Sequence, residues 1–420
     1  MCYKVKCSTC GKTGWGGCGN HLPSIYKNIP EGQHCPFTST TSTTWHHAIS
    51  SDSQGETSAS AGGYWDNLGY NPVPTDFMYT MKCLEGEDFS DGGLQPFGSI
   101  QLIPSACILN YGQAIIEDLR AYKKQDDSIL LFRPEEHGLR MTVGANRLCM
   151  PAPTIQQFVE AVKVIVSANR RWIPPPDKGF LHIRALLMGT GAVLSVTPAP
   201  EFTFLIYVTP VGKCFEESLK PINLVVENEV HRATCGGVGG VNAISNYAVV
   251  LKAQAAAIAN DFSEVLFLDS VHNRYLEEVS TANIFVVKAA EYRRTVLGLE
   301  NDRYNGILQE ICDKTISTPV LRGTILPGIK RKSMIDIACS LGFQVEERLV
   351  SVEELFDADE VFCIGDAVCF LPVGSITYLG KRVSYRESRL GTVSQQLYSA
   401  LSGIQMGLTE DKMGWIMVLK

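Results

Sequence analysis

Short hydrophobic runs, some of them alternating with polar residues, predict a series of β-strands from about residue 64 onward. In the first half of this region the candidate strands are "FMYTMKC", "ILLFRP", "FLHIRALLMG" and "EFTFLIYVTP". In the second half they are "INLVVE", "EVLFLDS", "NIFVVK", "EVFCIG" and "ITYL". Each run has the length of a strand in a globular protein, and "FMYTMKC" has the two-residue period of a strand with one buried face.

Other segments have the pattern of helices. In "TIQQFVEAVKVIVSANRRWI" the apolar residues recur at intervals of three and four, which predicts an amphipathic helix. Further helices are expected from about Asn246, after a glycine-rich loop, and in "LPGIKRKSMIDIACSLG", which Pro-Gly opens and Gly342 closes. "VSQQLYSALSGIQMG" is expected to be a closing helix. Strands and helices mixed in two halves predict a two-domain α/β or α+β fold.

Composition divides the chain into segments. We expect a Cys-rich segment over 1–37, a disordered low-complexity Ser/Thr/Gly linker over 38–63, a small domain over 64–208, an interdomain linker over 209–215 and a large domain over 216–420. Residues 289–314 interrupt the large domain, and a connection of this length between strands is unusual in a compact fold. We therefore expect these residues to form a surface excursion.

Bulk composition excludes several classes of protein. With 420 residues, 45% hydrophobic and 19% charged, the chain resembles an ordinary globular protein. Its net charge of -7 argues against a nucleic-acid partner, and its apolar runs are too short to span a membrane. No apolar segment follows Met1, and "MCYKVKCSTCGK" lacks the arginines of a transit peptide, so a cytoplasmic location is expected.

Cysteines are concentrated at the N-terminus, where five of the fourteen lie within the first 35 residues. Two pairs with two intervening residues, followed by one more cysteine, have the spacing of a zinc knuckle. The candidate metal ligands are Cys7, Cys10, Cys18, His21 and Cys35. A disordered tail with incidental thiols explains the same pattern, so both interpretations are open.

Three short motifs allow chemistry without specifying it. The loop "GGVGGVN" does not satisfy G-x-G-x-x-G, so it is either a flexible turn or a phosphate loop. The helix start in "ILPGIKRKS" is either an ordinary capped terminus or a site for a phosphate, which the unpaired amides would bind. Glu277 and Glu278 in "LEEVSTANIFVV" are either a solvated pair or include a carboxylate that faces a cationic ring.

Many motifs in a fixed order decide between these alternatives. They include "VPTDFMYTMKC", "LNYGQ", "LLFRPEEHGLRM", "LHIR", "PAPEFTFLIYVTPVG", "GGVGG", "NYAVVLKAQ", "VLFLDSVHNRYLEEVSTANIFVV", "GTILPGIKRKS" and "MGLTEDKMGW". Together they resemble the branched-chain amino acid aminotransferases, most closely the plant-type members of the class IV, fold type IV enzymes. The resemblance covers residues 64–420 apart from 289–314, and residues 1–37 resemble a separate small plant Cys-rich protein.

The resemblance implies an enzyme that transfers an amino group between leucine, isoleucine or valine and 2-oxoglutarate. It implies two domains with pyridoxal 5′-phosphate between them, and a homodimer that completes the site. The implied cofactor contacts are Arg140 to the phosphate, the amides of Ile329 and Lys330 to the same phosphate, Tyr247 to the phenolic oxygen and Glu278 to the pyridine nitrogen. The implied substrate contacts are Tyr111, Arg184 and the amide of Ala367.

Several positions depart from the family pattern. Asn242 stands where the family has the lysine that forms the Schiff base and moves the proton, so any bound cofactor would be held non-covalently. Asp366 replaces a threonine that donates to the phosphate; two unit charges of like sign about 4 Å apart repel by about 4 kcal/mol at intermediate dielectric. Lys330 replaces a threonine and offsets part of this repulsion. Ile116 and His182 replace aromatic pocket residues, while Asp118 replaces a glycine and is interpreted as a surface change.

Three hypotheses follow. The chain is an impaired branched-chain aminotransferase; or it is a silent relative that binds the cofactor or joins an active paralogue in a heterodimer; or it is a misassembled gene product in which 289–314 is retained intron. Its relatives in plants usually reside in plastids or mitochondria, which are the alternatives to the cytoplasm.

Overall fold

The computed structural model describes residues 3–6, 13–16, 64–69, 71–212, 220–289, 314–366, 370–385 and 390–420. The chain forms two compact units, Met1–Ala59 and Ser60–Lys420. In the first unit, β1 (Tyr3–Lys6) pairs with β2 (Thr13–Gly16) in an antiparallel hairpin. The five candidate zinc ligands lie outside the described residues, so the zinc site stays a prediction.

The first half of the second unit is built on a seven-stranded antiparallel sheet, with the strands in the order β18-β6-β5-β7-β8-β3-β4. Its strands are β3 (Phe77–Leu84), β4 (Gly93–Pro96), β5 (Ala114–Lys123), β6 (Ile129–Phe132), β7 (Gly179–Gly189), β8 (Glu201–Gly212) and β18 (Ile416–Leu419). A 3-10 turn, η1 (Trp65–Asn67), precedes them, and the short helix α2 (Cys107–Tyr111) leads into β5. Nearly every residue of β5 is buried, because both faces of this strand are covered.

Two helices, α3 (Pro134–Arg147) and α4 (Ile155–Ala168), pack on this sheet against β5, β3 and β8. The turn η2 (Arg170–Trp172) follows α4, which begins at a capping box formed by Thr154 and Gln157. Helix α3 lies unusually close to its neighbours: a Cβ on Gly144 would be 2.9 Å from Ile115 of β5. The buried face of α3 that packs here also includes His137 and Arg140, which contact Glu117 of β5.

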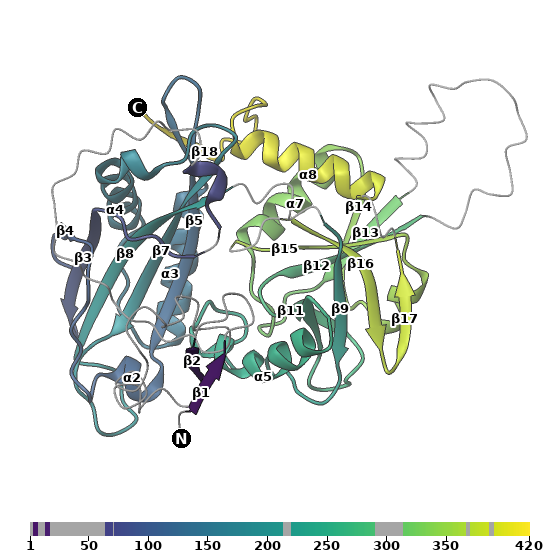
Figure 1. Cartoon of the computed structure of the whole chain (residues 1–420), viewed down its shortest axis with the longest axis horizontal. Coiled ribbons are helices and arrows are strands. Elements are labelled where there is room, and N and C mark those ends of the chain that lie inside the picture. Colours follow the sequence, from purple (N-terminus) through teal and green to yellow (C-terminus); the bar gives the residue numbers. More distant parts are fainter. Residues whose placement is uncertain are drawn as a thin grey trace, which may run out of the picture. The chain divides into compact units, whose positions relative to one another are not determined.

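The second half is built on a nine-stranded mixed sheet, shown in green to yellow in Figure 1. Eight strands follow the order β11-β10-β9-β16-β15-β12-β13-β14, and β17 pairs with β16. Their bounds are β9 (Ile222–Glu227), β10 (Glu264–Leu268), β11 (Leu276–Val279), β12 (Asn283–Ala289), β13 (Lys314–Pro319), β14 (Gln344–Arg348), β15 (Glu360–Ile364), β16 (Phe370–Tyr378) and β17 (Lys381–Ser384). The helical elements are α5 (Ser245–Ala259), α7 (Ile329–Ser340), η4 (Val352–Asp357) and α8 (Thr392–Gln405).

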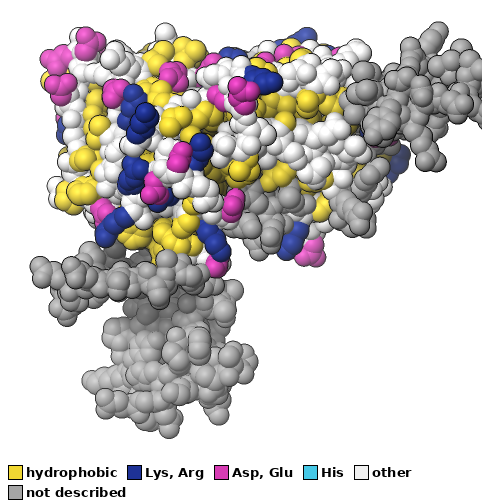
Figure 2. All heavy atoms as spheres, turned by 90° about the horizontal axis from the view of Figure 1, so that it is seen from above, with side chains coloured by type: hydrophobic (Ala, Val, Ile, Leu, Met, Phe, Trp, Pro, Cys, Tyr) yellow, Lys and Arg dark blue, Asp and Glu magenta, His cyan; other side chains and the backbone are white. Residues whose placement is uncertain are grey.

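Helices α7 and α8 contact each other and cover one region of the second sheet, while α5 packs on β10 (Figure 1). The core beneath α8 contains three phenylalanines: the ring centroids of Phe285 and Phe362 are 5.0 Å apart, and those of Phe362 and Phe370 are 4.7 Å apart. Aromatic stacking of this kind adds to the burial of apolar area. On the face seen in Figure 2, side chains of both charges are interspersed with hydrophobic ones.

The predicted α/β class is confirmed, and the candidate strands and helices of the hydrophobic pattern are present. The prediction that a helix closes the chain is wrong, because β18 follows α8 and returns to the first sheet to pair with β6. Residues 290–313, which make up most of the excursion predicted over 289–314, lie outside the described residues, so the excursion stays a prediction. Its two end residues, Ala289 and Lys314, belong to β12 and β13 and pair with each other. The predicted domain boundaries stay a prediction.

No helix in the described part of the chain combines the length and the hydrophobicity needed to cross a membrane.

Candidate functional site

The glycine-rich loop is fastened to the edge of β5, and this fixes the position of Asn242. The backbone N–H of Ile116 donates to the carbonyl of Asn242 at 3.0 Å, so the loop continues the pairing of the strand. The glycines allow a close approach on the other side: a Cβ on Gly239 would be 2.5 Å from the carbonyl oxygen of Thr324. The loop is therefore a packed connection rather than a flexible turn.

The side chain of Asn242 is buried and hydrogen-bonded. The hydroxyl of Tyr247, on the first turn of α5, donates to Oδ1 of Asn242 at 2.8 Å. Burial, with a smaller contribution from Asp118, raises the pKa of Tyr247, so its hydroxyl stays protonated and remains a donor. An amide in this position can neither form an imine nor act as a base near neutral pH.

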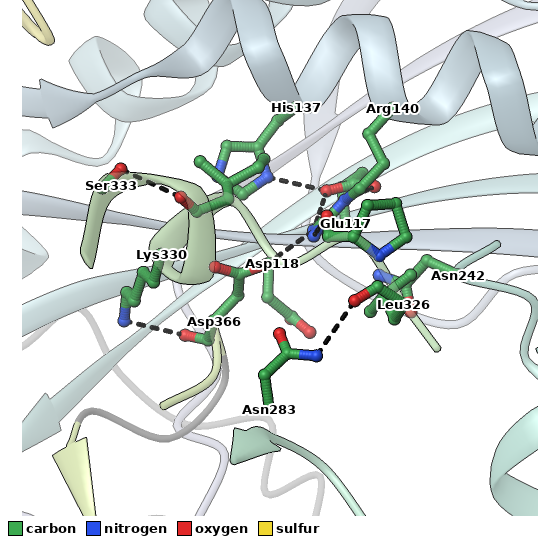
Figure 3. Close-up of polar contacts among 12 residues, drawn as sticks. Glu117, Asp118, His137, Arg140, Asn242, Asn283, Leu326, Lys330, Ser333 and Asp366 are labelled. Carbon is green, nitrogen blue, oxygen red and sulfur yellow. Dashed lines mark hydrogen bonds and ion pairs between the residues drawn. The ribbon is translucent and has the colours of Figure 1, made fainter. Parts of the chain in front are cut away.

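A buried charge cluster joins the two sheets at Arg140 (Figure 3). Glu117 of β5, which is fully buried, accepts from Nε of Arg140 at 2.9 Å and from Nη2 at 2.6 Å. Nδ1 of His137 lies 2.7 Å from Oε2 of the same carboxylate. Nη2 of Arg140 also donates to Oδ2 of Asp366 at 2.7 Å. The guanidinium is therefore shared between a carboxylate of each half.

Asp366 follows β15 and lies between Arg140 and Lys330 (Figure 3). Its Oδ1 atom is buried without a hydrogen-bond partner, and Nζ of Lys330 donates to its backbone carbonyl at 3.4 Å. Burial acts to raise the pKa of Asp366, but Arg140, His137 and Lys330 together outweigh it and hold the pKa below its ordinary value. Asp366 is thus a carboxylate whose second oxygen is left without a donor.

The start of α7 faces the same cluster. Ile329 and Lys330 are its first two residues, and the first N–H groups of a helix have no partner within it and carry a partial positive charge. The preceding Gly328 fits tightly, since a Cβ there would be 2.2 Å from Oδ1 of Asn283. Asn283 in turn donates to the carbonyl of Leu326 at 3.0 Å (Figure 3). The loop before α7 is therefore held in place by β12.

Glu278 of β11 forms the opposite end of the site. Its Oε1 atom accepts from the backbone N–H of Leu326 at 2.9 Å and lies 2.8 Å from Nη1 of Arg232. Burial raises the pKa of Glu278 to about 7 in spite of Arg232, which acts to lower it. Glu277 is also buried, so the alternative that these two glutamates are a solvated pair is wrong.

Polar residues on β5 and β7 line the side assigned to the substrate. Oδ1 of Asp118 lies 3.0 Å from Nε2 of His182 and accepts from Nε of Arg184 at 2.8 Å. Asp118 is buried, so the interpretation of this residue as a surface change is wrong. Burial opposes ionisation, but the two partners outweigh it and lower the pKa of Asp118, which stays charged. Ile116 beside it is buried.

The remaining candidate residues lie at or beyond the edge of this arrangement. Tyr111, at the end of α2, is partly exposed and donates from its hydroxyl to the carbonyl of Leu194 at 2.7 Å. Ala367 lies outside the described residues. Sequence reasoning missed Glu117, His137 and Arg232 as members of the site. Glu117 alone gave a signal, as one of two adjacent acidic residues, with Asp118, within the apolar run "AIIEDL".

Comparisons with known proteins assign the chain. Residues 114–376 match the family model described as amino-transferase class IV. The chain is 58% identical over 373 residues, 89% of its length, to branched-chain amino acid aminotransferase 2, chloroplastic, of Humulus lupulus, of which it covers 86%. The chain belongs to the class IV branched-chain aminotransferase family. It is also 51% identical over 352 residues to branched-chain amino acid aminotransferase 1, mitochondrial, of the same plant, with 84% of this chain and 83% of the relative aligned.

Solved structures agree with the branched-chain aminotransferase assignment. The crystal structure of a branched-chain amino acid aminotransferase from Escherichia coli superposes with a TM-score of 0.65 at 26% identity, covering 81% of this chain and 98% of that chain. The fold is therefore that of the fold type IV aminotransferases, as predicted. Residues 1–44 match a separate family model, described as a domain of unknown function.

Membership of the branched-chain aminotransferase family implies pyridoxal 5′-phosphate as cofactor, and the residues of this chain fit it only in part. At the ring end, Glu278 presents a buried carboxylate. At the phosphate end, Arg140 is already bonded to Glu117 and Asp366, and the unpartnered oxygen of Asp366 repels an anion. At the aldehyde end, Asn242 offers no amine. A carboxylate at Glu278 would suit the pyridine nitrogen of this cofactor, whereas the residues at the other two positions would suit neither its phosphate nor an imine.

Proposed function

We propose that this chain is a branched-chain aminotransferase by descent in which amino transfer is strongly impaired. The observation that supports this is the side chain at position 242, an amide bonded to Tyr247 at 2.8 Å in the place of an imine-forming lysine. Loss of a general base alone reduces a rate by about 10²–10⁴-fold, and loss of imine exchange adds to this. The substrates of the residual or ancestral activity would be leucine, isoleucine or valine with 2-oxoglutarate.

Two other lysines are near in sequence or in space, and neither replaces the lost amine. Lys252 is exposed on α5, beyond the turn that carries Tyr247. Lys330 directs Nζ to the backbone carbonyl of Asp366, at the end of the site that faces Arg140 rather than Asn242. The proposed impairment therefore stems from position 242 itself.

The test uses the full chain with an excess of pyridoxal 5′-phosphate. Borohydride reduction followed by mass spectrometry reports a lysine imine, and leucine-dependent formation of glutamate reports turnover. We expect neither in the natural chain, and both in Asn242→Lys combined with Asp366→Thr. Asn260→Lys, which adds an amine at the exposed end of α5, is the matched control and should show neither. Sustained turnover of leucine by the natural chain would contradict the proposal.

A second candidate function is that of a silent dimer partner, and an exposed apolar patch supports it. The patch consists of Ile103, Leu109, Leu194 and Val196, whose exposed fractions are 49%, 58%, 94% and 88%. The bond from Tyr111 to the Leu194 carbonyl holds its two segments together. Exposed apolar side chains gathered in this way are typical of an interface between proteins.

We propose that a second copy of this chain, or an active paralogue, covers this apolar patch. In analytical ultracentrifugation the natural chain should sediment as a dimer, and a Leu109→Asp, Val196→Asp variant as a monomer. Val271→Asp, at another exposed apolar position, should leave the dimer intact. A monomeric natural chain that also fails to associate with a co-expressed relative would contradict this.

Location and gene structure remain proposals of the same kind. The two relatives from Humulus lupulus are named chloroplastic and mitochondrial, which supports a plastid or a mitochondrion for this chain over the cytoplasm. A full-length fluorescent fusion imaged in plant cells distinguishes the three.

The retained-intron hypothesis for 289–314 predicts a transcript that lacks these codons, and sequencing the message tests it.

A further inference from the structure

The end of the site between Arg140 and α7 contains its own anion. Each nitrogen of the Arg140 guanidinium has an acceptor: Nε and Nη2 bond Glu117, Nη2 also bonds Asp366 at 2.7 Å, and Nη1 donates to the carbonyl of Pro327 at 3.3 Å. The positive charge is thus faced by two carboxylates, one of them fully buried. A ligand anion arriving here would have to displace one of them.

Asp366 also lies where the positive end of α7 would attract a ligand anion. Lys330, in the first turn of this helix, donates to the Asp366 backbone, so the helix start and the aspartate are adjacent. The side chain of Asp366 is nine-tenths buried, and its Oδ1 atom has no hydrogen-bond partner. Buried acceptors without a donor are rare in folded proteins, which points to a donor supplied by a ligand.

We propose that the Asp366 carboxylate takes the place of a bound phosphate, so that this chain selects pyridoxal over pyridoxal 5′-phosphate. The inference rests on the proposed function in one respect, namely that the ligand is a vitamin B6 ring. The two molecules differ only at the 5′ position. The hydroxyl of pyridoxal is a donor that satisfies Oδ1 of Asp366, whereas the phosphate ester brings acceptors and negative charge to an acceptor that is itself charged.

The test measures dissociation constants of both ligands with the full-length chain, by quenching of its intrinsic fluorescence. The natural chain should bind pyridoxal more tightly than pyridoxal 5′-phosphate. In Asp366→Thr, which removes the charge and adds a hydroxyl donor, the preference should shift toward the phosphate ester by about 100-fold or more. The control is Asp336→Asn on the exposed face of α7, which should leave the ratio of the two constants unchanged.

Inorganic phosphate serves as a probe without a ring. It should raise the melting temperature of Asp366→Thr and not that of the natural chain. This outcome without binding of either ring would uphold the exclusion of phosphate by Asp366 and refute the B6 ligand, while it would leave the proposed loss of amino transfer standing. Tighter binding of pyridoxal 5′-phosphate than of pyridoxal by the natural chain would overturn the inference, as would an unchanged ratio in Asp366→Thr.

Discussion

Neutralising Glu278 should change how the stability of this protein depends on pH. Burial raises the pKa of Glu278 from its ordinary 4.5 to about 7 in the folded chain. Between these two values the folded state therefore binds a proton that the unfolded state has released, and the free energy of unfolding falls as the pH rises. A rise in pKa of this size corresponds to about 3 kcal/mol at 1.36 kcal/mol per unit of pKa.

The comparison is between the natural chain and Glu278→Gln, in urea unfolding at a series of pH values from 5 to 8. Glutamine resembles the protonated glutamic acid and does not ionise, so in the variant the group beside Arg232 is neutral at every pH. We expect the difference in unfolding free energy, natural minus variant, to fall by about 2.5 kcal/mol across this range, because the rest of the change lies outside it.

The matched control is Glu353→Gln on the surface. A backbone hydrogen bond and Arg274 hold the pKa of Glu353 below its ordinary value, so its difference should be constant above pH 5. A constant or rising difference for Glu278→Gln would refute the reasoning, because the glutamate would then be ionised in the folded chain throughout.

Two further predictions concern the cluster and the excursion. Glu117→Gln removes the carboxylate shared by Arg140 and His137 and should lower the free energy of unfolding by about 3–5 kcal/mol. The control Glu160→Gln breaks an exposed ion pair and should lower it by less than about 1 kcal/mol. Equal losses for the two variants in urea unfolding would contradict the stabilising role of the buried cluster. Replacing residues 290–313 by Asn-Gly reduces the length of the β12–β13 connection about twelvefold, which is roughly three and a half halvings. Because each halving saves about 0.6 kcal/mol of loop-closure free energy, the free energy of unfolding should rise by about 2 kcal/mol. Loss of folding, seen by circular dichroism, would show that the segment is required.

The hydrophobic pattern predicted those helices and strands whose own residues show the period of a helix or a strand. Helix α4 has both an apolar stripe and a capping box, and β3 alternates along its length. Helix α3 was not predicted, because its packing depends on Gly138 and Gly144, which weaken the helical signal and matter only where Phe158 and Ile115 come close. The position of α3 therefore depends on residues that are distant from it in the sequence.

For the candidate site, the family resemblance located the residues in the sequence, whereas their hydrogen-bond partners are known only from the structure. Arg140, Asn242, Glu278 and Asp366 could be located in the sequence, but which acid Arg140 would bond could not. Asp118 shows why: the register of β5 and β7 places it directly opposite Arg184 and buries it. A sequence read alone contains no register, so a paired buried aspartate and a solvated one look the same.

The pairing of Ile416 with Phe132 makes the first sheet dependent on a segment from the far end of the chain. During synthesis β6 has an open edge until the ribosome has made residues 416–419, and open edges invite association with other chains. A fragment ending at residue 212 should accordingly aggregate, and a synthetic peptide covering 411–420 should keep it in solution by supplying the missing strand. Correct folding of the first sheet thus depends on residues 416–419, since a chain terminated before them would expose the edge of β6 to other chains.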